Sequence, residues 1–146
     1  IHISCRRQRQ MCIRDSSLRA TSLAMSEKAV LPGGGASHSM IAHHVRSEME
    51  SEPGRERIAM EAFARAMETI PAVLAENSGQ NPLDKVLKLR SEARIGNCMG
   101  IDRDGEITLP EGVWHPKSVI SGSLETATET AISMLRIDQV VSARGD

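Results

Sequence analysis

The chain has 146 residues, a formal net charge of −1 at pH 7 and only two aromatic side chains, Phe63 and Trp114. A nearly balanced charge gives no long-range attraction to nucleic acid or anionic lipid, so we expect neither nucleic acid nor a membrane as a partner. With so few aromatic residues, a core must be built from Ala, Leu, Ile, Val and Met, which favours packed helices over a β-sandwich.

The three cysteines, Cys5, Cys12 and Cys98, are an odd and scattered set. This arrangement argues against a disulfide framework and favours a reducing compartment, so we expect a cytoplasmic protein. No apolar run approaches the roughly 20 residues of a membrane-spanning helix. The first ten residues also lack the apolar core of a signal peptide.

Residues 1–16 differ in composition from the rest of the chain. The run CRRQRQMCIRDS is basic and has neither helical nor strand periodicity. It resembles a peptide produced when sequencing-adapter DNA is translated at the end of a reading frame, so we set 1–16 aside as a non-native segment. The rival interpretation is a basic arm that binds phosphate, as a free-standing nucleic-acid binder would need. No aromatic or amphipathic pattern supports that arm.

Apolar residues at helical spacing predict the remaining elements in chain order. Helices are expected over 18–28, over 36–50, from 55 to the ENSGQNP stop at 76–82, over 82–95, and from about 116 onward. Pro71 should kink or restart the third helix. Glu61, Glu68, Lys85 and Lys88 are interpreted as solvated helix faces or subunit contacts.

The hydrophobic period changes only after the fourth helix. In CMGIDRDGEITL, Asp104-Gly105 lies between two short apolar runs, which predicts a β-hairpin. The RIDQVV run at 136–141 is interpreted as a short terminal strand. The predicted fold class is therefore mainly α, with long packed helices, one small β-hairpin and a short strand at the end.

Three consecutive glycines stand directly before the second helix, in VLPGGGASH at 30–38. Without a Cβ, glycine adopts positive φ and lets another group lie against the backbone. At a helix N-terminus it also exposes N–H groups toward an anion or a polar ring. The plainer interpretation is a flexible turn, and the pattern alone leaves both open.

Several longer stretches resemble the group II chaperonins, which are the archaeal thermosome and its eukaryotic cytosolic relatives. They are VLPGGGA, GRERIAMEAFARAMETIPAVLAENSGQNPLDKVLKLR (54–90), MGID (99–102), GVWHP (112–116) and LETATETAISMLRIDQVV (124–141). The resemblance implies the C-terminal part of a subunit several times longer. Residues 17–32 would be the last helix of the intermediate domain, and 33–146 the C-terminal half of the equatorial, ATP-binding domain.

The same resemblance implies ATP-driven folding of non-native polypeptides inside a double ring of like or unlike subunits, with ATP and Mg²⁺ as cofactors. The family's phosphate-binding Gly-Asp-Gly-Thr-Thr loop is absent here, and no other phosphate-loop pattern replaces it. The Mg²⁺ ligands are therefore expected in the N-terminal half of a complete subunit. The position of the family's water-orienting aspartate falls on Ser16, so no catalytic residue is assigned. Hydrolysis is expected of the intact subunit and not of this chain alone.

Five residues are candidates for nucleotide binding by this resemblance: Gly33, Gly34, Gly35, Asp102 and His115. The glycines would line the pocket, and Asp102 would face the base. His115 stands where the family has an acidic residue that holds the ribose hydroxyls. A neutral imidazole accepts one hydrogen bond where a carboxylate accepts several, so the nucleotide would be held more weakly or differently. A surface-loop histidine is the alternative.

Two functions remain open from the sequence. The first is an ATP-hydrolysing folding machine, and the second is a structural subunit of a hetero-oligomeric ring that binds nucleotide poorly. A metal site is not expected, because His38, His43 and His44 do not have the i, i+4 spacing that lets one helix face hold a metal.

Overall fold

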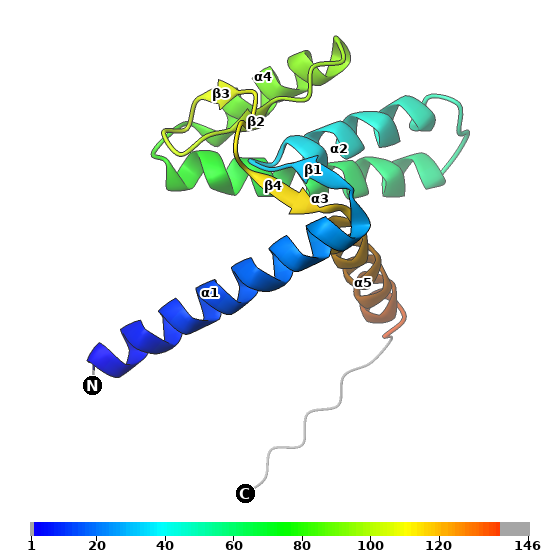
Figure 1. Ribbon diagram of the computed structural model, residues 1–146. Coiled ribbons are helices and arrows are strands. Elements are labelled where there is room, and N and C mark those ends of the chain that lie inside the picture. The colour runs from blue at the N-terminus through cyan, green and yellow to red at the C-terminus, as the bar shows by residue number, and fades with distance from the viewer. Residues whose placement is uncertain (1, 138–146) are drawn as a thin grey trace, which may run out of the picture. The chain divides into compact units, whose positions relative to one another are not determined.

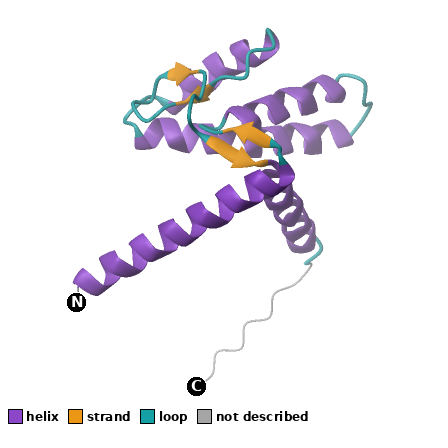
Figure 2. Cartoon of the chain, in the orientation of Figure 1, coloured by secondary structure: helices purple, strands orange, loops and turns teal. Residues whose placement is uncertain are grey.

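The computed structural model describes residues 2–137 of the chain. Its elements are α1 (His2–Glu27), β1 (Val30–Pro32), α2 (Ala36–Met49), α3 (Glu56–Asn77), α4 (Pro82–Arg94), β2 (Gly100–Ile101), β3 (Ile107–Thr108), β4 (Trp114–Pro116) and α5 (Lys117–Leu135). Helices dominate the described residues, as Figures 1 and 2 show, so the predicted mainly α fold is confirmed. The chain divides into two compact units, residues 30–115 and the two flanking segments 1–29 and 116–146.

The unit of residues 30–115 is built around α2, α3 and α4, which pack against one another. Small side chains let these helices approach closely, and four of the buried residues are fully covered alanines: Ala36, Ala42, Ala64 and Ala75. Ala75, Leu89 and Ile101 form a cluster that joins α3, α4 and β2. The core of this unit is thus aliphatic, as the composition predicted.

The ends of α4 and the hairpin follow local sequence signals. The Asn81 side chain accepts a hydrogen bond from the Leu83 N–H (3.0 Å), and Pro82 occupies the first turn. Strands β2 and β3 pair antiparallel, with Gly100 opposite Thr108 and Ile101 opposite Ile107. The hairpin predicted at Asp104-Gly105 is therefore confirmed. The terminal strand expected at 136–141 falls mostly outside the described residues.

Two features differ from the predicted elements. Helix α3 continues through Pro71, which is completely buried, so the helix does not restart there. Helix α1 extends back through the segment set aside at 1–16. Its large apolar side chains from Met11 onward are mostly exposed, so they contribute little burial. The helix is stabilised instead by the high helix propensity of residues such as Arg, Gln, Met and Ala. No helix of the described part is long and apolar enough to cross a bilayer.

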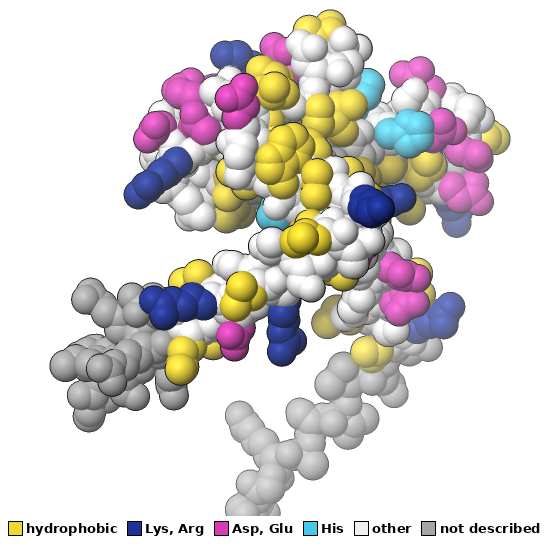
Figure 3. Space-filling model, in the orientation of Figure 1, with side chains coloured by type: hydrophobic (Ala, Val, Ile, Leu, Met, Phe, Trp, Pro, Cys, Tyr) yellow, Lys and Arg dark blue, Asp and Glu magenta, His cyan; other side chains and the backbone are white. Residues whose placement is uncertain are grey.

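The unit formed by the flanking segments has its own local contacts. The Lys117 N–H donates to the Ala29 carbonyl (3.1 Å), and the Ser118 N–H donates to Glu27 Oε2 (3.1 Å). The Glu27 carboxylate therefore satisfies a free N–H in the first turn of α5 and stabilises the positive end of that helix. Apolar side chains remain on the surface of the molecule (Figure 3). Leu18, Met134 and Leu135 are among the exposed ones.

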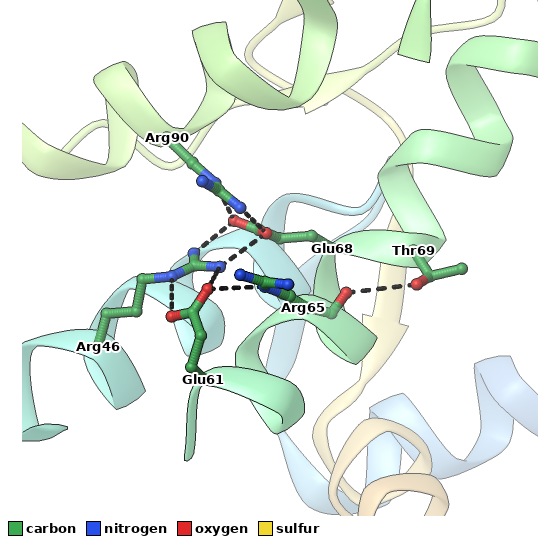
Figure 4. Close-up of polar contacts among 6 residues, drawn as sticks. All are labelled: Arg46, Glu61, Arg65, Glu68, Thr69 and Arg90. Atoms are coloured by element: carbon green, nitrogen blue, oxygen red, sulfur yellow. Dashed lines mark hydrogen bonds and ion pairs between the residues drawn. The ribbon is translucent and has the colours of Figure 1, made fainter. Parts of the chain in front are cut away.

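A buried carboxylate connects α2, α3 and α4. Glu68 on α3 is only 6% exposed and lies between Arg46 of α2 and Arg90 of α4 (Figure 4). Arg46 donates to both of its oxygens (2.5 and 2.8 Å), and so does Arg90 (2.6 and 2.5 Å). Glu68 is therefore not a solvated residue, and that interpretation is wrong. Helix periodicity could not reveal its burial, because the arginines that cover it lie on two other helices.

The surroundings of Glu68 favour its charged form. Burial, the largest single influence, raises the pKa of this carboxyl, but hydrogen bonds and charges from Arg46 and Arg90 together outweigh burial. The pKa of Glu68 therefore lies below its ordinary value of 4.5. The ionised carboxylate is the form that stabilises the three helices.

Replacing the carboxylate by an amide should destabilise this unit. In Glu68→Gln, Arg46 and Arg90 lose their shared charged partner, and we expect a loss of about 2–3 kcal/mol in the free energy of unfolding. The loss is below that of a fully buried pair because Arg90 remains 41% exposed. Glu61→Gln is the matched control, since Glu61 also bonds Arg46 but is 29% exposed, and should cost less than about 1 kcal/mol. Urea unfolding checks both, and equal losses would refute the role of Glu68.

Acid should remove the contribution of Glu68. A carboxyl whose pKa is lower in the folded state adds stability above its unfolded pKa, and this stability disappears as pH falls through the folded pKa. The difference in Tm between the wild-type chain and Glu68→Gln should thus be constant near neutrality and shrink below about pH 4.5. Thermal unfolding from pH 7 to pH 3 measures it. A difference that persists at pH 3 would contradict this assignment.

Candidate functional site

All five residues selected from the sequence border one cleft in the unit of residues 30–115. The cleft has a volume of about 950 Å³. Gly33, Gly34 and Gly35 enter it from the segment before α2, and Asp102 from the end of β2. His115 reaches it from β4. Apolar side chains from α3, the hairpin and the following loop complete the wall: Ile70, Leu74, Ile101, Leu109 and Val113.

Backbone hydrogen bonds fix the glycine segment on both sides. The Gly33 N–H donates to the Val113 carbonyl (2.8 Å), next to the β1–β4 strand pair. The Gly34 carbonyl accepts from the Ile101 N–H (2.8 Å). Helix α2 begins immediately afterwards, and the Ser37 hydroxyl of its first turn donates to the Pro32 carbonyl (2.6 Å). These bonds hold the N-terminus of α2 between β2 and β4 (Figure 1).

Contacts within the protein leave little room for a Cβ at any of the three glycines. A Cβ at Gly33 would clash with Val113 Cγ1 and lie 3.0 Å from the Val113 carbonyl oxygen, and one at Gly34 would lie 2.6 Å from the Ile101 carbonyl oxygen. A Cβ at Gly35 would meet the Pro71 ring at 2.9 Å. Gly34 and Gly35 also have positive φ values of 61° and 76°. The chain's own packing is thus a sufficient reason for these glycines, and their contact with a nucleotide stays a prediction.

The start of α2 carries free backbone donors. Among the described residues, no backbone or side-chain group accepts a hydrogen bond from the N–H groups of Gly34 or Gly35. These donors precede a 14-residue helix, whose N-terminus carries a partial positive charge. A flexible turn does not account for a segment bonded in this way. The arrangement suits an anionic or strongly polar ligand.

Asp102 has a structural role that the sequence analysis missed. Its Oδ1 accepts hydrogen bonds from the N–H groups of Asp104 (3.0 Å) and Glu106 (2.8 Å), which closes the hairpin turn. No described residue donates to its Oδ2. One oxygen of this carboxylate therefore organises the turn, while the other remains available at the cleft wall.

His38 is a cleft residue that the sequence analysis did not select. It lies in the first turn of α2, three residues after Gly35, and lines the same cleft as His115. Burial lowers the pKa of His38, and the nearby positive charge of protonated His115 lowers it further. The position of His38 in the first helical turn after the glycines was the signal available in the sequence, because the first turn of a helix borders whatever its N-terminus faces.

A second, smaller cleft of about 460 Å³ lies between α2, α3 and α4, where Arg46, Arg90 and Arg94 are found. Arg46 and Arg90 already bind Glu68, so their charges stabilise the packing of α2, α3 and α4. Among the described side chains, no three His, Cys, Asp or Glu residues gather closely enough to hold a metal ion.

Comparison with known sequences identifies relatives over nearly the whole chain. The family model described as the TCP-1/cpn60 chaperonin family matches residues 7–145. The thermosome subunit of Methanocaldococcus jannaschii is 40% identical over 134 residues, which cover 88% of this chain and 25% of that protein. Thermosome subunit beta of Thermoplasma acidophilum is 42% identical over 132 residues, which cover 88% and 24%. The chain spans about a quarter of the length of these relatives.

The family match begins inside the segment set aside at 1–16. It therefore extends further toward the N-terminus than residues 17–146, to which the resemblance assigned domains. The non-native origin of that segment stays a prediction, as does the division of the chain between intermediate and equatorial domains.

Solved structures agree with the sequence relatives. An open-state monomer of a group II chaperonin from Methanococcoides burtonii superposes with a TM-score of 0.70 at 33% identity, covering 74% of this chain and 28% of that one. A group III chaperonin in the open state gives a TM-score of 0.72 at 34% identity, covering 77% and 24%. On this combined evidence the predicted resemblance is confirmed, and the chain belongs to the TCP-1/cpn60 chaperonin family.

Proposed function

We propose that this chain supplies part of the nucleotide site of an ATP-dependent chaperonin subunit. Such subunits would assemble into a double ring in the cytoplasm, of one or several subunit types, and enclose and fold non-native polypeptides. The observation that carries the proposal is the cleft itself, since five residues chosen from separate parts of the sequence border it together. Membership of the chaperonin family supports the same proposal.

The residues around the cleft fit ATP. A volume of about 950 Å³ lies in the range of small-molecule sites. The free N–H groups of Gly34 and Gly35 suit a phosphate or a ribose oxygen, and the apolar wall suits the faces of a base. Asp102 Oδ2 would accept from an exocyclic amino group, and His115 would bond a ribose hydroxyl.

Bound ATP would supply the free energy of phosphate transfer that drives a chaperonin cycle. Mg²⁺ would accompany the phosphates, and we assign it no ligand among the described residues. Its ligands are proposed to lie in the part of the longer relatives that this chain does not span. The residues described here would bind and orient the nucleoside end of ATP.

A second candidate is a structural subunit that binds nucleotide poorly within a hetero-oligomeric ring. His115 favours it, because an imidazole provides fewer acceptor sites than the carboxylate implied by the resemblance. The use of Asp102 Oδ1 within the hairpin favours it too, since only one oxygen is left for a ligand. The two candidates differ in whether the cleft binds nucleotide at all.

ADP titration of the 146-residue chain separates the candidates. The wild-type chain should bind ADP, and Ile70→Glu should weaken binding at least about tenfold, because it replaces an apolar cleft contact with a like charge. Val73→Glu is the matched control on α3. Val73 is 44% exposed against 41% for Ile70 but does not line the cleft, so its ADP affinity should stay within about twofold.

Isothermal titration calorimetry measures these affinities, and circular dichroism verifies that both variants remain helical. No binding of ADP by the folded wild-type chain would refute the nucleotide site and favour the structural subunit. Equal loss of affinity in the two variants would show that the cleft is not where ADP binds.

The chain alone should not hydrolyse ATP faster than the buffer does. Phosphoryl transfer depends on holding the phosphates, the metal and the attacking water in position. The sequence contains no phosphate-loop pattern, and the water-orienting position falls on Ser16. Phosphate release with ATP and Mg²⁺ measures the rate. Turnover by the wild-type chain that disappears in Ile70→Glu would contradict this expectation.

A further inference from the structure

The second cleft, between α2, α3 and α4, is separate from the proposed nucleotide cleft. The two clefts share no lining residue. Consecutive residues of α2 divide between them, since His38 lines the nucleotide cleft and Ser39 lines the second one. The second cleft has a volume of about 460 Å³, which lies within the range of small-molecule sites. It is therefore large enough to hold a ligand of its own.

Polar side chains from one face of each of two helices line the second cleft. Helix α2 contributes Ser39, His43 and Ser47, which are spaced four residues apart and so lie on one face of that helix. Helix α4 contributes Arg90 and Arg94, which have the same spacing. Helices of one folded unit normally pack through apolar faces. Two polar faces that border one cleft therefore indicate a role besides packing.

The hydroxyl of Ser39 marks the cleft as a binding site. It has no hydrogen-bond partner among the described residues, although Ser39 is only 8% exposed. Leaving a buried hydroxyl unpaired destabilises the folded state, so native structures seldom do so without a reason. Because Ser39 lines the second cleft, a ligand in that cleft would complete the missing hydrogen bond.

The arginines of α4 keep donor groups that the contact with Glu68 does not use. Arg90 reaches the Glu68 carboxylate through Nε and Nη2 (Figure 4), and its Nη1 has no acceptor among the described residues. Arg94 is exposed and forms no ion pair with any residue that the structure describes. In Arg46, by contrast, each of the three nitrogens donates to Glu61 or Glu68. The free donors of the cleft therefore come from α4.

The formal charges of the lining favour an anion. Arg46, Arg90 and Arg94 contribute three positive charges, and Glu50 and Glu68 contribute two negative ones, with the histidine counted as neutral. Glu68 is already bonded by two arginines, and Glu50 is exposed to solvent, which screens its charge. The unused N–H groups thus belong to a positively charged lining.

We propose that the second cleft binds a phosphate group, held by the Ser39 hydroxyl of α2 and by Arg90 and Arg94 of α4. Arginine N–H groups form charge-assisted hydrogen bonds with phosphate oxygens, often two at a time. Because the donors belong to two helices, the tetrahedral oxygens of a phosphate meet them better than the two oxygens of a planar carboxylate. The bound group would connect α2 to α4 and stabilise the unit of residues 30–115. This site does not depend on the proposed nucleotide site.

Calorimetric titration of the full 146-residue chain with inorganic phosphate tests the proposal, in a phosphate-free buffer of constant ionic strength. We expect saturable binding with a dissociation constant of about 1 mM or below. Acetate should bind at least about fivefold more weakly, because it offers fewer oxygens to the arginines. Absence of saturable phosphate binding by the folded chain overturns the site. Equal affinity for acetate overturns the assignment of phosphate as its ligand.

Three variants locate the bound phosphate. Arg94→Gln should weaken phosphate binding at least about fivefold. Lys88→Gln is the matched control, since it removes a positive charge from the exposed surface of α4 at a residue that does not line the cleft. Its phosphate affinity should stay within about twofold. Ile70→Glu alters only the nucleotide cleft and should also stay within about twofold.

Two results would contradict this location of the phosphate. Equal losses in Arg94→Gln and Lys88→Gln would show a general attraction to the charge of α4 and overturn the site. A loss in Ile70→Glu with none in Arg94→Gln would place the phosphate in the nucleotide cleft, which overturns it as well.

Ser39→Ala supplies an independent measurement. In the ligand-free chain this substitution removes an unpaired buried hydroxyl, so the Tm should rise by about 2 °C or more. Phosphate affinity should fall about three- to tenfold, because one hydrogen bond to the ligand is lost. A serine that serves the fold alone would not combine a higher Tm with weaker phosphate binding. A lower Tm, or an unchanged phosphate affinity, would overturn the role of Ser39 and with it the proposed site.

Discussion

The close approach of the Gly33–Gly35 backbone to three other parts of the chain is the constraint on which the cleft depends. Val113, Ile101 and Pro71 each occupy space that a Cβ at the facing glycine would need. Those three neighbours come from the loop before β4, from β2 and from α3. A larger residue at any glycine would therefore move a wall of the cleft, and the positive φ values of Gly34 and Gly35 add backbone strain for any substitution there.

The opposite end of α2 is held by different chemistry. Near its C-terminus, Arg46 bonds the buried Glu68 carboxylate, which Arg90 of α4 bonds as well. Backbone contacts thus fix one end of α2, and a shared charge fixes the other. The first constraint depends on shape, whereas the second depends on the ionised form of Glu68 and weakens as the pH falls below the ordinary carboxyl pKa of 4.5.

The sequence predicted those features that depend on local periodicity and turn chemistry. Apolar stripes located α2, α3 and α4, and Asp104-Gly105 located the hairpin. The β1–β4 pair was missed, because two three-residue strands far apart in the chain leave no periodic signal. The burial of Glu68 was missed as well, since its arginine partners lie on two other helices. In the cleft, the resemblance selected five lining residues but not His38, whose place depends on how α2 meets β4.

Residues that the fold already explains say little about the ligand. Packing alone accounts for the three glycines, and turn closure alone accounts for Asp102 Oδ1. What the fold does not require is more informative: the free N–H groups of Gly34 and Gly35, Asp102 Oδ2, and the imidazoles of His38 and His115. The N–H groups donate hydrogen bonds and suit an anion, whereas a neutral imidazole offers one donor and one acceptor. The carboxylate suits a donor instead, so the proposed nucleotide, which has both an amino group and negative charge, would use both kinds of group.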